Sequence, residues 1–138
     1  MLPTLCHCTQ LRRAARKATR LYDQALAPLG WKVPQFSLLR TIARLEHPSI
    51  TSLASATGLE RSTLGRNLRP LERLELITLT GGEDLRTRRV GLTDRGHGKL
   101  TEGAGYWAEA QAQFEAASGA EGQTQLKQLL DRFVEDGD

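Results

Sequence analysis

Residues 50–93 read ITSLASATGLERSTLGRNLRPLERLELITLTGGEDLRTRRVGLT, and the first half of this stretch has the pattern of two short helices joined by a tight turn. Thr51 suits the start of the first helix, because its hydroxyl can accept a bond from a free backbone N–H. Gly58 suits its end, since glycine readily adopts a positive φ. A second helix is predicted from about residue 61 to about residue 74. Its leucines fall at i, i+4 and i+7 on one buried stripe: Leu64, Leu68 and Leu71.

The opposite side of the second helix carries short hydroxyls, an amide and arginines. These residues are Ser62, Thr63, Arg66, Asn67 and Arg69. Such groups form hydrogen bonds with base edges and phosphates. A helix with an apolar back and this polar front is suited to read the major groove of duplex DNA.

The second half of the stretch predicts a basic β-hairpin. Residues 76–80 and 88–92 have the pattern of short strands, and Gly81-Gly82 supplies the positive φ that a hairpin turn requires. The charged residues near its tip are Asp84, Arg86, Arg88 and Arg89. A basic hairpin directly after a helix-turn-helix is a wing, and Ser49-Ile50 is predicted to add a short third strand to it.

These residues resemble the MarR family of bacterial transcriptional regulators. The family's wing pattern, D-x-R-x-x-x-V-x-L-T, is matched by Asp84, Arg86, Val90, Leu92 and Thr93. Gly58-Leu59 followed by Arg61-Ser62-Thr63 matches the family's helix-turn-helix. The resemblance extends from about residue 6 to about residue 134. It implies a mainly α fold with a small β wing, a winged helix-turn-helix flanked by N- and C-terminal dimerisation helices.

The resemblance also implies how the chain is organised and what it binds. We expect one domain over residues 1–138, with the winged helix-turn-helix at 33–92 and dimerisation helices at 5–29 and 93–135. The end helices would interlock with those of a second subunit. A two-fold homodimer places two reading helices one DNA turn apart, so the expected partner is double-stranded DNA with a pseudo-palindromic operator.

The flanking segments have helical periodicity. Pro34 suits the first turn of a helix that reaches about Leu45. Thr93 is predicted to cap a long helix that reaches about Ala117 despite four glycines, and Ser118-Gly119 breaks the chain before a last helix. Apolar stripes follow residues 5–29 (Leu11, Ala15, Ala18, Tyr22, Ala25, Leu29) and the last helix (Leu126, Leu129, Leu130, Phe133, Val134).

Three residues depart from the family pattern. Gly65 lies in the reading helix where a polar residue is common, so the family's base specificity does not transfer. Pro70 removes one backbone hydrogen bond inside this helix and predicts a kink. Glu75 follows the helix where a glycine is usual, which puts the usual left-handed termination in doubt.

Composition sets the outer limits. The chain has 138 residues, 39% of them hydrophobic, which predicts one domain with a modest core that a second copy completes. No stretch is apolar enough to span a membrane, and residues 1–8 lack the apolar run of a signal peptide, so we expect no membrane association and a cytoplasmic location. Reduced cysteines are expected there.

The net charge of +3 is unevenly distributed along the chain. Five cations near the N-terminus have no acid among them: Arg12, Arg13, Arg16, Lys17 and Arg20. From Glu102 onward there are eight acidic residues against two basic ones. The basic stripe could contact phosphate, but the pattern favours a solvated face or pairing with acidic helices.

Cys6-His7-Cys8 is the one reactive-looking feature, and three interpretations stay open. The cysteines are inert, or they sense oxidants through a thiolate whose pKa is lowered by Arg12 and Arg13, or they bind a soft metal. Because side chains two residues apart diverge, a disulfide would link two subunits. We expect no resident metal or other cofactor.

The leading functional hypothesis is a sequence-specific, DNA-binding transcriptional regulator, a dimeric repressor released by a small phenolic or apolar ligand or by cysteine oxidation. Ser62, Thr63, Arg66 and Asn67 are assigned to the major groove. Arg86, held by Asp84, is assigned to a flanking minor groove, while Arg61 and Arg88 are assigned to phosphates. The alternative is a protein-interaction module that keeps the fold without reading DNA. We recognise in the sequence no paired catalytic carboxylates, no nucleophile motif and no phosphate-binding glycine loop, so we do not expect an enzyme.

Overall fold

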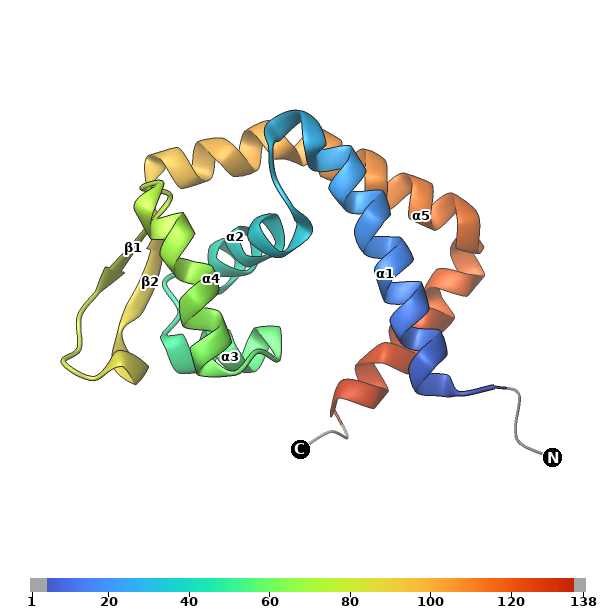
Figure 1. Cartoon of the computed structure of the whole chain (residues 1–138), viewed down its shortest axis with the longest axis horizontal. Coiled ribbons are helices and arrows are strands. Elements are labelled where there is room, and N and C mark those ends of the chain that lie inside the picture. Colours follow the sequence, from blue (N-terminus) through green and yellow to red (C-terminus); the bar gives the residue numbers. More distant parts are fainter. Residues whose placement is uncertain (1–4, 136–138) are drawn as a thin grey trace. The chain divides into compact units, whose positions relative to one another are not determined.

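The computed structural model describes residues 5–135 and, among them, every side chain except that of Leu85. Helices dominate, with one two-stranded antiparallel sheet, so the predicted mainly α fold with a β wing is confirmed (Figure 1). The elements are α1 (His7–Leu26), the 3-10 turn η1 (Ala27–Leu29), α2 (Val33–Leu45), α3 (Ile50–Thr57), α4 (Arg61–Arg73), β1 (Ile77–Thr80), the 3-10 turn η2 (Leu85–Thr87), β2 (Arg89–Leu92) and α5 (Asp94–Glu135).

The chain divides into two compact units. The winged-helix unit comprises residues 26–105, and the helical unit comprises the described residues 5–25 and 106–135. Almost all of the buried apolar side chains belong to the winged-helix unit: Leu26, Trp31, Phe36, Leu38, Leu39, Ile42, Ile50, Leu53, Leu64, Leu68, Leu71, Leu76, Ile77 and Val90. Within its described residues, the helical unit buries Ala110 alone. The winged-helix unit therefore has a core of its own.

Helix α3 is capped by a different residue from the one predicted. The Ser49 hydroxyl accepts a hydrogen bond from the Ser52 backbone N–H at 3.0 Å, so Ser49 is the N-cap. Thr51 is the second residue of the helix, and its hydroxyl instead donates to the Arg86 carbonyl oxygen at 3.3 Å. Gly58 ends the helix with φ of 72°, as predicted.

Helix α4 buries the predicted stripe of Leu64, Leu68 and Leu71 against this core and continues through Pro70. It ends in a Schellman motif, in which the Leu76 N–H donates to the Leu71 carbonyl and the Glu75 N–H donates to the Glu72 carbonyl. Glu75 occupies the left-handed position with φ of 60°. The left-handed termination is thus retained although glycine is absent.

The two strands of the wing pair in antiparallel register, from Ile77 opposite Leu92 to Thr80 opposite Arg89. Gly81 and Gly82 both have a positive φ, as the turn was predicted to require. The predicted third strand is wrong in extent. It is reduced to one bridge between Ser49 and Arg89, because Ile50 already begins α3.

Helix α5 begins as predicted, with the Thr93 hydroxyl accepting from the Gly96 N–H at 3.0 Å. Two of its glycines mark close packing, since a Cβ at Gly96 would meet the Leu76 carbonyl and one at Gly103 would meet the Phe36 ring. Gly119, with φ of 73° and ψ of 163°, interrupts the helical backbone at the predicted break. No described helix is both long and apolar enough to cross a membrane.

The helical unit contains α1 and the second half of α5. Tyr22 donates a hydrogen bond to the Gln111 side chain, which ties the two helices together. The predicted continuous helix over 5–29 is shorter, because its last turn tightens into η1 before Gly30 in the left-handed conformation. Several large apolar side chains of this unit are exposed: Leu5, Leu11, Tyr106, Leu129, Leu130, Phe133 and Val134.

Candidate nucleic-acid interface

Helix α4 presents the predicted polar front. Its stripe of leucines is buried. Of the predicted front, Ser62, Arg66 and Arg69 are exposed and Thr63 and Asn67 are half-buried, and Arg61 at the start of the helix is also exposed. Arg66 Nη2 donates to Thr63 Oγ1 at 3.3 Å, one turn earlier in the helix. This bond directs the guanidinium along the helix towards its N-terminal end. A surface rich in hydrogen-bond donors therefore covers the first turns of α4.

Gly65 leaves a gap in this surface. A Cβ built at Gly65 meets no atom within 4 Å, and the residue is half-exposed. Neither a close backbone contact nor a positive φ requires glycine there. The missing side chain consequently leaves open space at the surface of α4 and is not required by packing within the protein.

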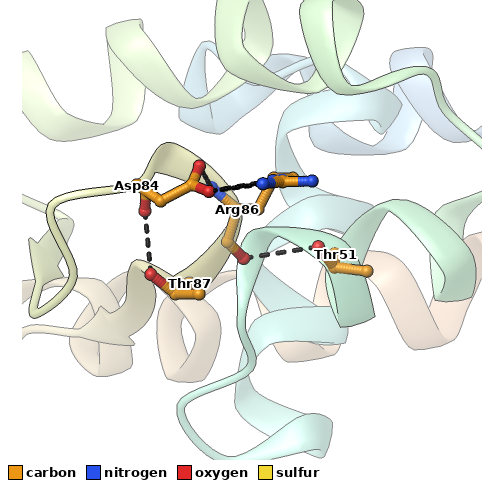
Figure 2. A network of polar contacts seen from close by, with 4 residues as sticks. All are labelled: Thr51, Asp84, Arg86 and Thr87. Carbon is orange, nitrogen blue, oxygen red and sulfur yellow. Dashed lines mark hydrogen bonds and ion pairs between the residues drawn. The ribbon is translucent and has the colours of Figure 1, made fainter.

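The wing tip is organised around Asp84 and Arg86, and Figure 2 shows the network. Arg86 Nε and Nη2 donate to Asp84 Oδ2 at 3.0 and 2.7 Å, and the Arg86 backbone N–H donates to Asp84 Oδ1 at 3.0 Å. The Thr87 hydroxyl donates to the Asp84 carbonyl at 2.9 Å. The predicted pairing of Asp84 with Arg86 is confirmed.

Thr51 connects this wing tip to α3. Its hydroxyl donates to the Arg86 carbonyl oxygen, so the backbone that carries Arg86 is anchored on the helix-turn-helix as well as on the wing (Figure 2). Sequence reasoning missed this role because Thr51 also suits a helix cap. The pattern of the sequence held no sign of the contact, since 35 residues separate Thr51 from Arg86.

The electrostatics of the wing tip favour the charged forms. Hydrogen bonds from the side chain and backbone of Arg86 lower the pKa of Asp84, and the charge of Arg61 lowers it further. The hydrogen bond and charge of Asp84 raise the pKa of Arg86. Arg61, at the start of α4, is thus within electrostatic reach of the wing. Both partners are half-exposed or more, so the pair positions Arg86 rather than contributing much stability.

Two further arginines follow on the wing. Arg88 is exposed and its backbone carbonyl accepts from the Ile50 N–H at 3.1 Å. Arg89 Nη1 donates to the His47 carbonyl oxygen at 3.3 Å, and its backbone bridges Ser49. Arg88 therefore keeps its guanidinium at the surface, whereas Arg89 braces the wing against the loop before α3.

The two cysteines belong to the helical unit, whereas α4 and the wing belong to the winged-helix unit. Both are exposed free thiols. The side-chain and backbone hydrogen bonds of Thr9 lower the pKa of Cys6. The predicted cause, the charge of Arg12 and Arg13, is wrong. In the part of the chain that is described, no three His, Cys, Asp or Glu side chains are placed to hold a metal ion.

Comparisons with known proteins agree on the family. The model of the MarR family matches residues 31–84. The M. tuberculosis transcriptional regulator MosR in complex with DNA is 32% identical, with 96% of each chain covered and a TM-score of 0.84. No curated protein sequence gives a significant match.

Two more distant structures share the fold. Bordetella bronchiseptica BpsR, a protein whose DNA binding is regulated by 6-hydroxynicotinic acid, is 19% identical, with 100% of this chain and 99% of that chain covered and a TM-score of 0.85. The apo form of E. coli MarR is 19% identical, with coverage of 95% and 98% and a TM-score of 0.73. By the identity and coverage of the MosR match, together with the family model, the chain belongs to the MarR family of transcriptional regulators.

Proposed function

We propose that the protein is a homodimeric repressor that reads a pseudo-palindromic operator in double-stranded DNA. Two features of the winged-helix unit together support this proposal: the exposed face of α4 is rich in hydrogen-bond donors, and a wing arginine is already held in place. Arg86 is fixed by Asp84 through its side chain and by Thr51 through its backbone. An arginine that is ordered before binding loses less conformational entropy when it enters a narrow minor groove.

The face of α4 supplies the groups that discriminate bases in the major groove. Arginine forms bidentate bonds with guanine, asparagine does so with adenine, and hydroxyls accept or donate to either. In this role Ser62, Thr63, Arg66 and Asn67 contact base edges, and Arg66 exchanges its bond with Thr63 for one to a base. Arg61 and Arg88, which are exposed at the start of α4 and on the wing, bind phosphates.

The state of the helical unit supports the homodimer. Its described residues bury no large apolar side chain, while Phe133 and Val134 are 72% and 73% exposed. Helices with such stripes are stable when a partner covers them. A two-fold dimer through 5–29 and 93–135 repeats the 33–92 reading module and accounts for a pseudo-palindromic operator.

Cysteine oxidation is the first of two proposed release mechanisms. The thiol of Cys6 is exposed and its lowered pKa increases the thiolate fraction. The thiolate attacks a peroxide, which breaks the O–O bond and leaves a sulfenic acid and water. A cysteine thiol of the second subunit, Cys6 or Cys8, then displaces a second water and forms the disulfide. The peroxide is reduced by the two electrons that the thiols lose.

Binding of a small ligand is the second release mechanism. In the winged-helix unit a pocket of about 260 Å³ is lined by Trp31, Gln35, Arg95 and Lys99, among others. An aromatic ring against Trp31 and an acidic group near the two cations would suit it, and 6-hydroxynicotinic acid, which acts on BpsR, has this character. Two other aromatic side chains do not line this pocket, because Phe36 is buried in the core and Tyr22 is hydrogen-bonded to Gln111.

A gel shift on the DNA upstream of the protein's own gene tests the function. The protein is used reduced and after mild peroxide, alongside Cys6→Ser and Cys8→Ser. Retarded complexes that peroxide abolishes in the wild type and not in Cys6→Ser support repression released by oxidation, and Cys8→Ser shows which thiol of the second subunit completes the disulfide. Complexes that survive peroxide favour the ligand. The absence of any complex, on this or other genomic fragments, favours the alternative of a protein-interaction module.

A further inference from the structure

Helix α1 carries a continuous basic face that the contacts proposed above do not use. We define the α1 basic face as Arg12, Arg13, Arg16, Lys17 and Arg20, all of which are exposed. At 100° per residue they fall within an arc of about 140°. The apolar stripe through Leu11, Ala15 and Tyr22 lies on the opposite side of the helix. Covering that stripe with a partner would therefore leave the α1 basic face in solvent.

This arrangement is unfavourable for an ordinary solvated helix. Three pairs of like charge stand at i,i+4, namely Arg12 with Arg16, Arg13 with Lys17, and Arg16 with Arg20, and such pairs destabilise a helix. Elsewhere α5 combines opposite charges on its surface, as in Lys99 with Glu102 and Lys127 with Asp131. Among residues 5–135, no acidic side chain forms an ion pair with the α1 basic face.

The composition and shape of the α1 basic face fit phosphate. Four of its five cations are arginines, whose planar fork matches phosphate oxygens better than the point charge of lysine does. Arg13, Arg16, Lys17 and Arg20 surround an open depression of about 530 Å³ on the surface of the helix. One phosphate group placed there would have several donors within reach.

We propose that the α1 basic face is a second DNA-binding surface, which binds the phosphate backbone of duplex DNA without regard to sequence. Helix α1 belongs to the helical unit, whereas α4 and the wing belong to the winged-helix unit. Phosphate would relieve the repulsion among the cations, and counterions released from DNA would drive the association. The contribution is to affinity and to its salt dependence, and base discrimination stays with α4.

Titration of the full-length protein with a random-sequence duplex at several salt concentrations tests the proposal. The variants are Arg16→Gln, its matched control Arg132→Gln, and the combined Arg13→Gln/Arg16→Gln/Lys17→Gln/Arg20→Gln. Arg132 is an exposed arginine of the same unit and lies outside the face. Circular dichroism serves as a folding check, and the combined variant is expected to keep its helix content because it loses like-charge repulsion.

The salt slope should flatten by about 0.9 for each phosphate contact that is lost. Arg16→Gln should therefore flatten it by up to about 0.9 and the combined variant by up to about 3.6, with at least a tenfold loss of affinity at low salt. Arg132→Gln should leave the slope nearly unchanged. Equal slopes for Arg16→Gln and Arg132→Gln would overturn the proposal. A combined variant that keeps the wild-type slope would overturn it too, whether or not its subunit association changes. The random duplex holds no operator, so failure of base reading would not affect this result.

Discussion

Among single residues, Asp84 has the clearest link between chemistry and function. Its carboxylate accepts from the side chain and from the backbone of Arg86, and these bonds lower its pKa. Because the pKa of Asp84 is lowered, the ion pair contributes to stability at pH values above the ordinary pKa of an aspartate. This contribution is lost as the pH falls through the lowered pKa. At neutral pH the carboxylate is charged, and Arg86 is held in the orientation that the proposed minor-groove contact needs.

Asp84→Asn separates positioning from net charge. The change adds one positive charge, so electrostatics alone predicts tighter binding to any DNA. Loss of the ion pair frees the Arg86 side chain, which must then be ordered on binding, so we expect operator affinity to fall by roughly 3- to 10-fold. Affinity for random duplex should be equal or higher. Fluorescence anisotropy on both duplexes measures the two effects, and a rise in operator affinity would show that Asp84 does not position Arg86.

Helices whose buried face follows a local periodic pattern could be predicted from the sequence. Leu64, Leu68 and Leu71 fall on one side of α4 at helical spacing, and the structure buries all three. The cap of α3 was not predictable, because Ser49 and Thr51 both offer a hydroxyl at the start of the helix. A contact with Arg86, distant in sequence, engages Thr51, and such contacts leave no local pattern. The DNA contacts assigned to α4 and the wing stay predictions.

The end of α4 carries a measurable backbone strain. Glu75 adopts φ of 60° in the Schellman motif, a conformation that costs a residue other than glycine roughly 1–2 kcal/mol. Glycine removes this strain, but it also makes the unfolded chain more flexible, which lowers the free energy of unfolding by about 0.4–1 kcal/mol. We expect Glu75→Gly to raise the free energy of unfolding by about 0.5–1 kcal/mol in urea denaturation.

Glu75→Ala is the matched control for this prediction. It also removes a negative charge near the C-terminus of a helix, where the macrodipole disfavours anions, but it keeps the strained φ. Its stability should stay close to that of the wild type or rise less than that of the glycine variant. If alanine stabilised the protein as much as glycine, the charge rather than the backbone conformation would be responsible.

For the whole molecule, the helical unit is the part that the sequence predicted least completely. Its stripes were visible as periodic apolar residues, yet Leu129, Leu130, Phe133 and Val134 are largely exposed in one chain. Periodicity indicates that a face is to be buried and does not say against what. The winged-helix unit presents no such difficulty, because its stripes bury one another within the chain.

Phe133→Asp tests whether a second copy covers this face. The ring is 72% exposed, so the protomer should fold normally, whereas a dimer that buries the ring loses about 2 kcal/mol or more and gains a buried charge. We expect the variant to be monomeric in sedimentation velocity at micromolar concentrations where the wild type is dimeric. Leu74→Asp, an equally apolar exposed position at the end of α4, is the control and should stay dimeric. A monomeric wild type would rule out the proposed dimer.

The most direct test of the account is the discrimination between the operator fragment and a shuffled duplex of the same composition, measured for the wild type, Asn67→Ala and Arg88→Gln. If α4 reads bases, Asn67→Ala should reduce the difference in binding free energy between the two duplexes by about 1–3 kcal/mol. Arg88→Gln should weaken binding to both duplexes alike and flatten the salt slope by about 0.9. If Asn67→Ala instead weakened both duplexes equally and left their ratio unchanged, α4 would not read the sequence and the central claim would be wrong.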